Sequence, residues 1–370
     1  MIIIEKIQSL SLPKNARIIV ISDIHGELEL LQSLLERVNF KSEDYLIING
    51  DLCEKGTNSL AVVSFMKGLS DKNSKVHVIE GNCDTLVENL LEEDPKLLNY
   101  ITKKENTLLN DCLKYIGVKL DTISNINELK NIVMKEFSNE INWLNELPTA
   151  IETDDFIFVH AGLENIPEWR KTTRENALTI PSFLDKGHQA NKFIVVGHWP
   201  VINYPSEIPS NNPIIDLENK IIAIDGGNII KETGQLNALI IEKSPQGNRF
   251  SHTYTDRFIK SETIKDFQAE SQMTGSISYP FFDISPIEEG EDFTQCRQHG
   301  TNKKVCVKNE YIKQNKNGEY TVRTDVSCAQ ISVKKGEIVS ILDNTCSGYT
   351  LIKKDGLVGW ISKNCLKETL

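Results

Sequence analysis

Residues 17–26 read RIIVISDIHG, and the fold class follows from this stretch and its neighbours. Its first six residues, 17–22, are a nearly continuous apolar run, which is typical of a strand buried on both faces of a sheet. Residues Glu27–Val38 then place leucines at helical spacing, and residues 45–49 form a second apolar run. Strand, helix and strand in succession are the signature of an α/β architecture.

Five further apolar runs extend this pattern through the first two-thirds of the chain: residues 76–79, 156–159, 193–196, 221–224 and 238–241. Between the first two of them, residues 85–149 become mostly helical in pattern, which predicts a helical cap inserted into the sheet core. Such a cap is either a packing layer or a wall over a substrate cleft, and the sequence favours neither.

Composition and turn signals divide the chain into three parts. Residues 1–257 carry the α/β pattern, whereas residues 258–318 are polar and irregular, which predicts a linker or accessory segment. From residue 319 to residue 370 the pattern changes to short strands separated by glycine turns. This last pattern predicts a small, all-β barrel.

Composition also excludes several classes of protein. Hydrophobic residues make up 39% of the chain and charged residues 25%, as in a globular protein with a buried core. The net charge of −11 argues against non-specific nucleic-acid binding, which needs clustered basic residues, but leaves room for a small phosphorylated substrate held by metal ions. No apolar run reaches the roughly 18 residues that span a bilayer. The first ten residues do not resemble a signal peptide, and eight scattered cysteines indicate the reducing cytoplasm.

Short polar motifs follow five of the predicted strands, where ligand sites of α/β sheets gather. Each contains an Asp, Asn or His beside a glycine, and the residues concerned are Asp23 and His25, Asp51, Asn82, His160, and His198. A single Asp-x-His is more often a turn or a core histidine. Five such motifs at five strand ends instead indicate a metal centre, because these side chains suit Mn, Fe or Zn.

As an ordered set, the motifs resemble those of the calcineurin-like metallophosphoesterases, over roughly residues 16–245. The closest resemblance is to the bacterial branch of the phosphoprotein phosphatases, which includes diadenosine-tetraphosphatase-like enzymes. The stretch 143–163 (WLNELPTAIETDDFIFVHAGL) is also similar to that branch, and Pro200 stands where phosphodiesterase branches have a second His. The resemblance implies a four-layer sandwich of two mixed sheets flanked by helices.

The resemblance also implies a site with two divalent metal ions, Mn in the first place and Fe or Zn as alternatives. Asp23 and His25 would bind one ion, and Asp51 would bridge both. Asn82, His160 and His198 would complete the second. A water bridging the two cations would attack a phosphomonoester or phosphoanhydride.

Three departures from the family pattern affect the catalytic residues. Cys83 stands where the family has a His that protonates the leaving oxygen, and a thiol is a weak hydrogen-bond donor. Glu54 and Lys55 replace an Asp-Arg pair, so the positive charge for the phosphate is kept without the bidentate fork. Pro181 matches the position of a phosphate-binding Arg, for which Arg170 or Arg174 are candidates to substitute.

Two functions stay open on this basis. The first is a phosphatase-like hydrolase, with a phosphoprotein, a dinucleoside polyphosphate, a nucleic-acid end or a small phosphate ester as substrate. The second is a weakly active or inactive phosphate-recognition module. Residues 319–370 resemble an SH3-like barrel, which in the second case would recruit a peptide or protein partner. No membrane partner is expected in either case.

Overall fold

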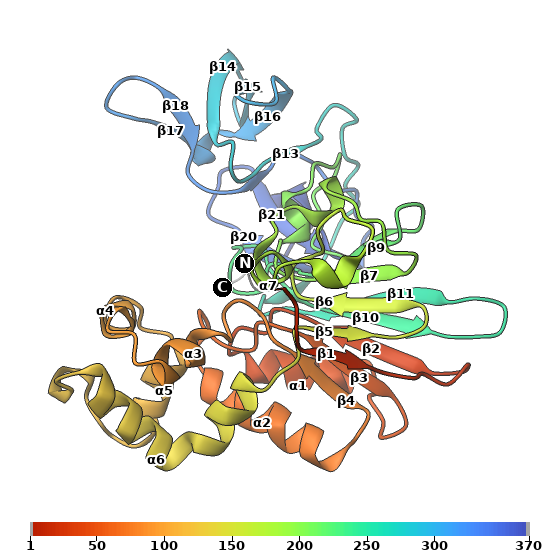
Figure 1. Cartoon of the computed structure of the whole chain (residues 1–370). Helices are drawn as coiled ribbons and strands as arrows, with labels where there is room; N and C mark the ends of the chain where they lie inside the picture. The colour runs from red at the N-terminus through yellow and green to blue at the C-terminus, as the bar shows by residue number, and fades with distance from the viewer. Residues whose placement is uncertain (1–2, 368–370) are drawn as a thin grey trace. The chain divides into compact units, whose positions relative to one another are not determined.

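The structure is a computed structural model that describes residues 3–367, and the chain forms two compact units (Figure 1). The first unit holds the residues up to Trp199 together with Pro213–Ile230 and Gln235–Thr255. The second holds Pro200–Asn212, Lys231–Gly234 and the residues from Asp256 onward.

Two mixed sheets form the centre of the first unit. The six-stranded sheet has the order β1 (Ile7–Ser9), β5 (Ala150–Glu152), β6 (Phe156–Val159), β7 (Phe193–Val196), β9 (Ile221–Ala223) and β8 (Ile214–Asp216). The five-stranded sheet has the order β11 (Arg249–Thr255), β10 (Leu236–Glu242), β2 (Arg17–Ile21), β3 (Tyr45–Asn49) and β4 (Val76–Ile79). Strands β2, β3 and β4 are parallel, whereas β10 pairs antiparallel to β2.

The surroundings of strand β2 explain why its sequence is almost entirely apolar. Ile18 and Val20 belong to the core cluster that includes Phe156 and Phe158 of the other sheet. Successive side chains of a strand point to opposite faces, and Ile19 accordingly belongs to a different cluster, together with the helical residues Leu31 and Leu34. Both faces of the strand are therefore covered, and the predicted α/β fold with two mixed sheets and flanking helices is confirmed.

Helices α1 (Leu28–Arg37) and α2 (Ser59–Lys72) lie along the outer face of the five-stranded sheet (Figure 1). The predicted helical insertion consists of α3 (Leu86–Leu91), α4 (Lys96–Lys103), α5 (Leu108–Tyr115), a 3-10 turn at Leu120–Thr122, and α6 (Ile126–Asn145). The start of α5 is capped by Thr107, whose hydroxyl accepts a hydrogen bond from the backbone N–H of Asn110. A further short helix, α7 (Arg174–Thr179), lies between β6 and β7 in the chain.

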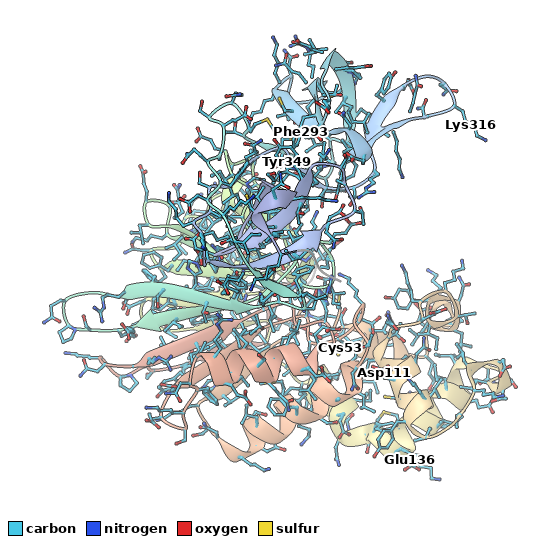
Figure 2. The ribbon with its side chains drawn as sticks, turned by 180° about the vertical axis from the view of Figure 1, so that it is seen from behind. Cys53, Asp111, Glu136, Phe293, Lys316 and Tyr349 are labelled. Atoms are coloured by element: carbon cyan, nitrogen blue, oxygen red, sulfur yellow. The ribbon has the colours of Figure 1, made fainter. Side chains whose placement is uncertain are left out.

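Three small sheets form the second unit. The four-stranded sheet has the order β12 (Lys260–Glu262), β20 (Ile338–Asp343), β21 (Tyr349–Lys354) and β22 (Leu357–Ser362). The five-stranded sheet has the order β16 (Lys304–Lys308), β15 (Phe293–Gln298), β14 (Asp283–Glu289), β18 (Tyr320–Val322) and β17 (Ile312–Gln314). The two-stranded sheet pairs β13 (Ser276–Ile277) with β19 (Val326–Ser327). Their shared core contains Ile277, Cys296, Val307 and Trp360. Around it, the rings of Phe293 and Tyr349 meet edge to face with centroids 5.0 Å apart, whereas Lys316 lies at the tip of the β17–β18 hairpin (Figure 2).

The structure differs from the expectation of an irregular segment at residues 258–318. That segment contains β12 to β17, and the sheet built around β14 and β15 continues past residue 319 into β18. Strand β15 explains why the pattern was missed, because its sequence FTQCRQ is mostly polar although every second residue is buried. Small and amide side chains fill those buried positions, so apolar content alone does not reveal the strand. The SH3-like resemblance of residues 319–370 stays a prediction.

Among residues 3–367, no helix is long and apolar enough to cross a membrane.

Candidate metal centre

The six predicted metal ligands lie in the loops that follow the sheet strands. Asp23 and His25 follow β2, Asp51 follows β3 and Asn82 follows β4. From the other sheet, His160 follows β6 and His198 follows β7. Asp23, His25 and His160 are completely buried, and Asp51 is 1% exposed.

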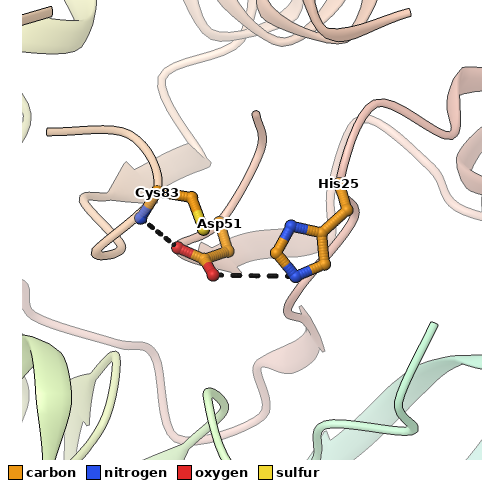
Figure 3. Close-up of side chains that lie close together, drawn as sticks. All are labelled: His25, Asp51 and Cys83. Atoms are coloured by element: carbon orange, nitrogen blue, oxygen red, sulfur yellow. Dashed lines mark hydrogen bonds and ion pairs between the residues drawn. The ribbon is translucent and has the colours of Figure 1, made fainter. Parts of the chain in front are cut away.

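Two groups of potential metal ligands share Asp51. Asp23, Asp51 and His160 form one group, and His25, Asp51 and Cys83 form the other. Within each group the ligating atoms all lie within 4.8 Å of one another. Figure 3 shows Asp51 between His25 and Cys83, with His25 Nε2 3.6 Å from one carboxylate oxygen. A carboxylate placed between two ligand groups is suited to bridging a pair of cations.

Asn82 and His198 join the group that contains His160. Asn82 Oδ1 lies 3.1 Å from His160 Nε2 and 2.8 Å from His198 Nδ1. The rings of His160 and His198 lie 5.2 Å apart between centroids. The structure thus brings together all six residues predicted as metal ligands, although their roles at the metals stay a prediction.

Backbone carbonyls orient two of the imidazoles. His25 Nδ1 lies 3.0 Å from the carbonyl oxygen of Cys53, and His160 Nδ1 lies 2.9 Å from that of Asn49. A ring that donates its Nδ1 proton to a carbonyl presents a free lone pair at Nε2, which is the arrangement that metal-bound histidines use.

Unsatisfied polar atoms test whether a cation fits the site. His25 Nε2 and Asp23 Oδ1 are buried, and neither has a hydrogen-bond partner among the residues that the structure describes. The two atoms lie 3.9 Å apart. Buried polar atoms normally have partners, so electron-rich atoms left facing one another fit a site built for divalent cations.

The loops that carry these side chains have an unusual backbone conformation. Among residues 3–367, thirteen non-glycine residues have positive φ, and six of them lie here: Asp23, His25, Asp51, Glu54, Lys55 and His198. Such conformations are costly for residues with a side chain and are typical of functional sites. Gly197 permits the close approach of two loops, since a Cβ at this position would lie 2.3 Å from Asp23 Oδ2.

The charges around Asp51 favour its ionised form. Burial raises its pKa, but the neighbouring His160, His25 and Lys55 outweigh this effect and lower the pKa to about 2. Burial lowers the pKa of His25, and burial together with His160 lowers that of His198 to about 4. Deprotonated carboxylate and neutral imidazole are the forms that bind metal ions.

Asp84 is a site residue to which the sequence analysis assigned no role, although it belongs to the third motif. Its carboxylate accepts hydrogen bonds from the backbone N–H groups of Asp51, Leu52, Cys53 and Gly81, at 2.8 to 3.1 Å. It therefore holds the loop of Asp51 against the loop of Cys83. The signal in the sequence was its fixed place two residues after Asn82.

Glu54 and Lys55 have different surroundings. The Glu54 carboxylate accepts hydrogen bonds from Leu108 N (2.9 Å) and from the Tyr100 hydroxyl (3.1 Å), so it connects the Asp51 loop to the helical insertion. Lys55 is exposed. Burial lowers the Lys55 pKa, but the neighbouring Cys83, Asp51 and Asp23 leave it raised. Its ammonium group therefore remains positive beside the candidate metal centre.

A pocket of about 410 Å³ adjoins the centre. Asn82, Cys83 and Glu54 line it from the side of the strand-end loops. Residues of α3 and α4 and the loop between them line the rest: Leu86, Asn89, Asp94, Lys96, Leu97 and Tyr100. Of the two interpretations of the helical insertion, this geometry favours the wall of a cleft.

The two arginines considered for phosphate binding differ in position. Arg170 pairs with Glu152, and its side chain is 51% exposed. Arg174 instead lines a second pocket, of about 540 Å³, which Asn82 also lines, and its guanidinium binds Glu80 and Glu88. Arg174 is therefore the arginine near the centre, but two carboxylates already neutralise it.

Fold and site together are those of the metallophosphoesterase class of proteins. The chain belongs to the family described as calcineurin-like phosphoesterase, whose model matches residues 16–224.

Curated relatives of the chain are named symmetrical bis(5'-nucleosyl)-tetraphosphatase. One from Vibrio campbellii is 30% identical over 42% of this chain and 48% of its own length. One from Erwinia tasmaniensis is 32% identical over 42% of this chain and 47% of its own. The chain thus matches about half the length of these relatives. A solved structure titled as a putative diadenosine tetraphosphatase has 18% identity and a TM-score of 0.45, and covers 68% of this chain and 99% of that one.

Proposed function

We propose that the chain hydrolyses a phosphoanhydride bond of a dinucleoside polyphosphate, with two divalent cations bound at the candidate metal centre. The observation that carries this proposal is the convergence of five other candidate ligand side chains around Asp51, with His25 Nε2 and Asp23 Oδ1 left without hydrogen-bond partners among residues 3–367. When bound, such a cation pair would supply positive charge for the attacking and leaving oxygens and would activate water.

The residues of the candidate metal centre have different roles in the proposed reaction. In this proposal Asp51 is the shared ligand. Asp23 and His25 would bind one cation, and Asn82, His160 and His198 would bind the other. For these carboxylate, amide and imidazole groups Mn²⁺ is the first choice, with Fe²⁺ and Zn²⁺ as alternatives. Lys55 adds a positive charge that attracts the phosphate chain of the substrate.

The residue at position 83 supports an anhydride substrate. General acid catalysis is typically worth about 10²–10⁴-fold, and a thiol is a weak donor for this purpose. An alkoxide leaving group needs such a proton, whereas a phosphate leaving group departs without one. The relatives named as tetraphosphatases point to the same class of substrate.

The pocket next to the centre supports a substrate larger than a simple phosphate ester. Its lining combines the ring of Tyr100, the apolar Leu86 and Leu97, and the polar Asn89. These groups suit a nucleoside, whose base has an apolar face and a polar edge. A nucleoside held there would leave its phosphate chain beside Asn82 and Cys83.

The test is a substrate panel with Mn²⁺: a bis(5'-nucleosyl) tetraphosphate, an aryl phosphate, a phosphodiester and a phosphoserine peptide. We expect the fastest turnover for the tetraphosphate and the slowest for the phosphoserine peptide. Fastest turnover on phosphoserine would contradict the choice of an anhydride. No turnover above a metal-free control, with metal shown to be bound, would overturn the hydrolase proposal itself.

A pair of variants controls this experiment. Asp51→Asn should lower turnover by at least about a hundredfold, because the shared ligand loses its charge. Asp71→Asn makes the same chemical change on the exposed side of α2, where Asp71 pairs with Lys67. Turnover of that variant should equal that of the unmodified protein.

A further inference from the structure

We propose that Cys83 is a metal ligand, and that with His25 and Asp51 it forms a cation position selective for thiophilic divalent ions such as Zn²⁺, Fe²⁺ or Co²⁺. This rests on the proposed function only in that it requires a cation at the same centre. It replaces the expected role of position 83, proton donation to the leaving group, with a different one.

The first argument is geometric. The Cys83 sulfur, His25 Nε2 and an oxygen of Asp51 lie within 4.8 Å of one another. Zinc binds sulfur at about 2.3 Å and nitrogen at about 2.0–2.1 Å, so two such ligands of one tetrahedral ion lie roughly 3.6 Å apart. The 4.8 Å bound exceeds that separation by about 1.2 Å, so the proposal requires the Cys83 sulfur to lie at, or to move to, the shorter distance.

The second argument is that the partners of the sulfur are held in place. The backbone N–H of Cys83 donates a hydrogen bond to Asp51 Oδ1 at 2.8 Å, which fixes the two residues side by side (Figure 3). His25 is fully buried, and its Nδ1 is engaged by the carbonyl of Cys53. Its Nε2 faces the same point as the sulfur and has no hydrogen-bond partner among residues 3–367.

The third argument concerns access and chemistry. Cys83 is half-buried and lines the pocket beside the centre, unlike a cysteine that only fills a core. Thiolate ligands select Zn, Fe and similar ions over Mn and Mg. On binding, the sulfur–metal bond forms and the thiol proton leaves to solvent, because a coordinating thiol is deprotonated outright.

The direct test is an absorption spectrum of the full-length chain after its metals are replaced by Co²⁺. A cobalt–thiolate bond gives a sulfur-to-metal charge-transfer band in the near ultraviolet, which oxygen and nitrogen ligands do not give. We expect the band in the unmodified protein and its loss in both Cys83→Ser and Cys83→His. Cys306→Ser is the matched control, because Cys306 is also a half-buried free thiol but lies in the second unit, and it should keep the band.

Metal selectivity gives a second readout. It would not change if Cys83 had a purely structural role. The ratio of Zn²⁺ affinity to Mn²⁺ affinity should fall in Cys83→Ser by at least about tenfold. Removing a residue that only hydrogen-bonds to a metal ligand already lowers metal affinity by about this factor. An equal loss of affinity for both ions would indicate a general disturbance of the site and would contradict the proposal.

The outcomes separate this inference from the proposed function. Bound Co²⁺ without the band in the unmodified protein, or a band that survives in Cys83→Ser, overturns the inference and leaves the hydrolase proposal standing. A band that depends on Cys83 without turnover on any substrate supports the inference and overturns the hydrolase. If either Cys83 variant fails to fold, the spectrum of the unmodified protein still decides. Failure to bind any divalent ion overturns both.

Discussion

The position of Asp51 depends on Asp84, which belongs to neither group of candidate metal ligands. Asp84 gathers four backbone N–H groups from the Asp51 and Cys83 loops around one buried carboxylate. Burial and the neighbouring Asp51 raise the pKa of Asp84, so the arrangement is electrostatically costly and is kept by these hydrogen bonds. Several residues of the Asp51 loop also have positive φ, which adds to the cost of holding it in place.

We predict that Asp84→Asn destabilises the protein and weakens metal binding together. An amide has only one acceptor oxygen, so at least one buried N–H loses its partner, at a cost of about 1–3 kcal/mol. Chemical denaturation measures the first effect and metal titration the second. Asp71→Asn is again the control and should change stability by less than about 0.5 kcal/mol. Unchanged metal affinity in Asp84→Asn would contradict a positioning role.

At the scale of elements, α4 and α5 are attached to the metal loops through Glu54. This carboxylate reaches the N-terminus of α5 at Leu108 and the hydroxyl of Tyr100 on α4. Since α3 and α4 also line the pocket beside the centre, the same contact sets the position of the pocket wall. The helical insertion and the metal centre are therefore connected by one buried acid.

We predict a pH dependence of stability that comes from Glu54. Burial raises its pKa to about 7, so between its ordinary value of 4.5 and 7 the folded state binds the proton that the unfolded state has released. Its contribution to the free energy of unfolding is therefore complete below about pH 4.5 and is lost as the pH rises through 7. Glu54→Gln should remove about 1–3 kcal/mol of this decline.

Thermal unfolding at several pH values measures this effect. The control is Glu136→Gln, on the exposed surface of α6 within the same insertion (Figure 2). That variant should retain the pH dependence of the unmodified protein. Identical pH profiles for Glu54→Gln and the unmodified protein would show that this carboxyl is not the titrating group.

At the scale of the whole molecule, the metal centre gathers loops from both sheets of the first unit. Residues from Asp23 to His198 contribute to it, so cation binding requires the folded arrangement of most of this unit. A ligand that binds only the folded state stabilises it by mass action.

Metal removal should therefore destabilise the chain. A divalent cation at 100 times its dissociation constant is expected to add about 2.7 kcal/mol to the free energy of unfolding. Thermal unfolding with the cation and with a chelator measures the difference. Asp51→Asn should abolish it, and a shift of unchanged size in that variant would place the stabilising cation elsewhere.

The second unit is assembled from distant parts of the sequence. Its core includes Ile202, Ile277 and Cys296 as well as Trp360, and β12 pairs with β20 across almost eighty residues. The backbone N–H of Val358 also donates to the carbonyl of Pro209.

We predict that a fragment of residues 319–370 does not fold by itself. It lacks β12 and most of the hydrophobic partners of Trp360, which a sheet of this size needs for independent stability. Circular dichroism and cooperative thermal unfolding test this. A cooperative transition in the fragment would support an autonomous barrel, as the SH3-like resemblance implies.

Many strands of the first unit could be predicted from the sequence. The apolar runs placed β2, β3, β4, β6 and β7 within one residue of their bounds, because strands covered on both faces are mostly apolar. The strands of the second unit could not be predicted as fully from the sequence. Strands such as β15 bury small and polar side chains on one face, so their pattern of apolar residues is weak.

The sequence alone thus identifies the candidate metal ligands, since their residue types and the strands they follow can be read from consecutive positions. It does not settle which atoms meet. Only the packed sheets place Cys83 beside His25, turn Glu54 toward the helical insertion and assign four backbone donors to Asp84. Most of these contacts join residues tens of positions apart, and their distances depend on how two sheets and a cap pack, which no short stretch of sequence encodes.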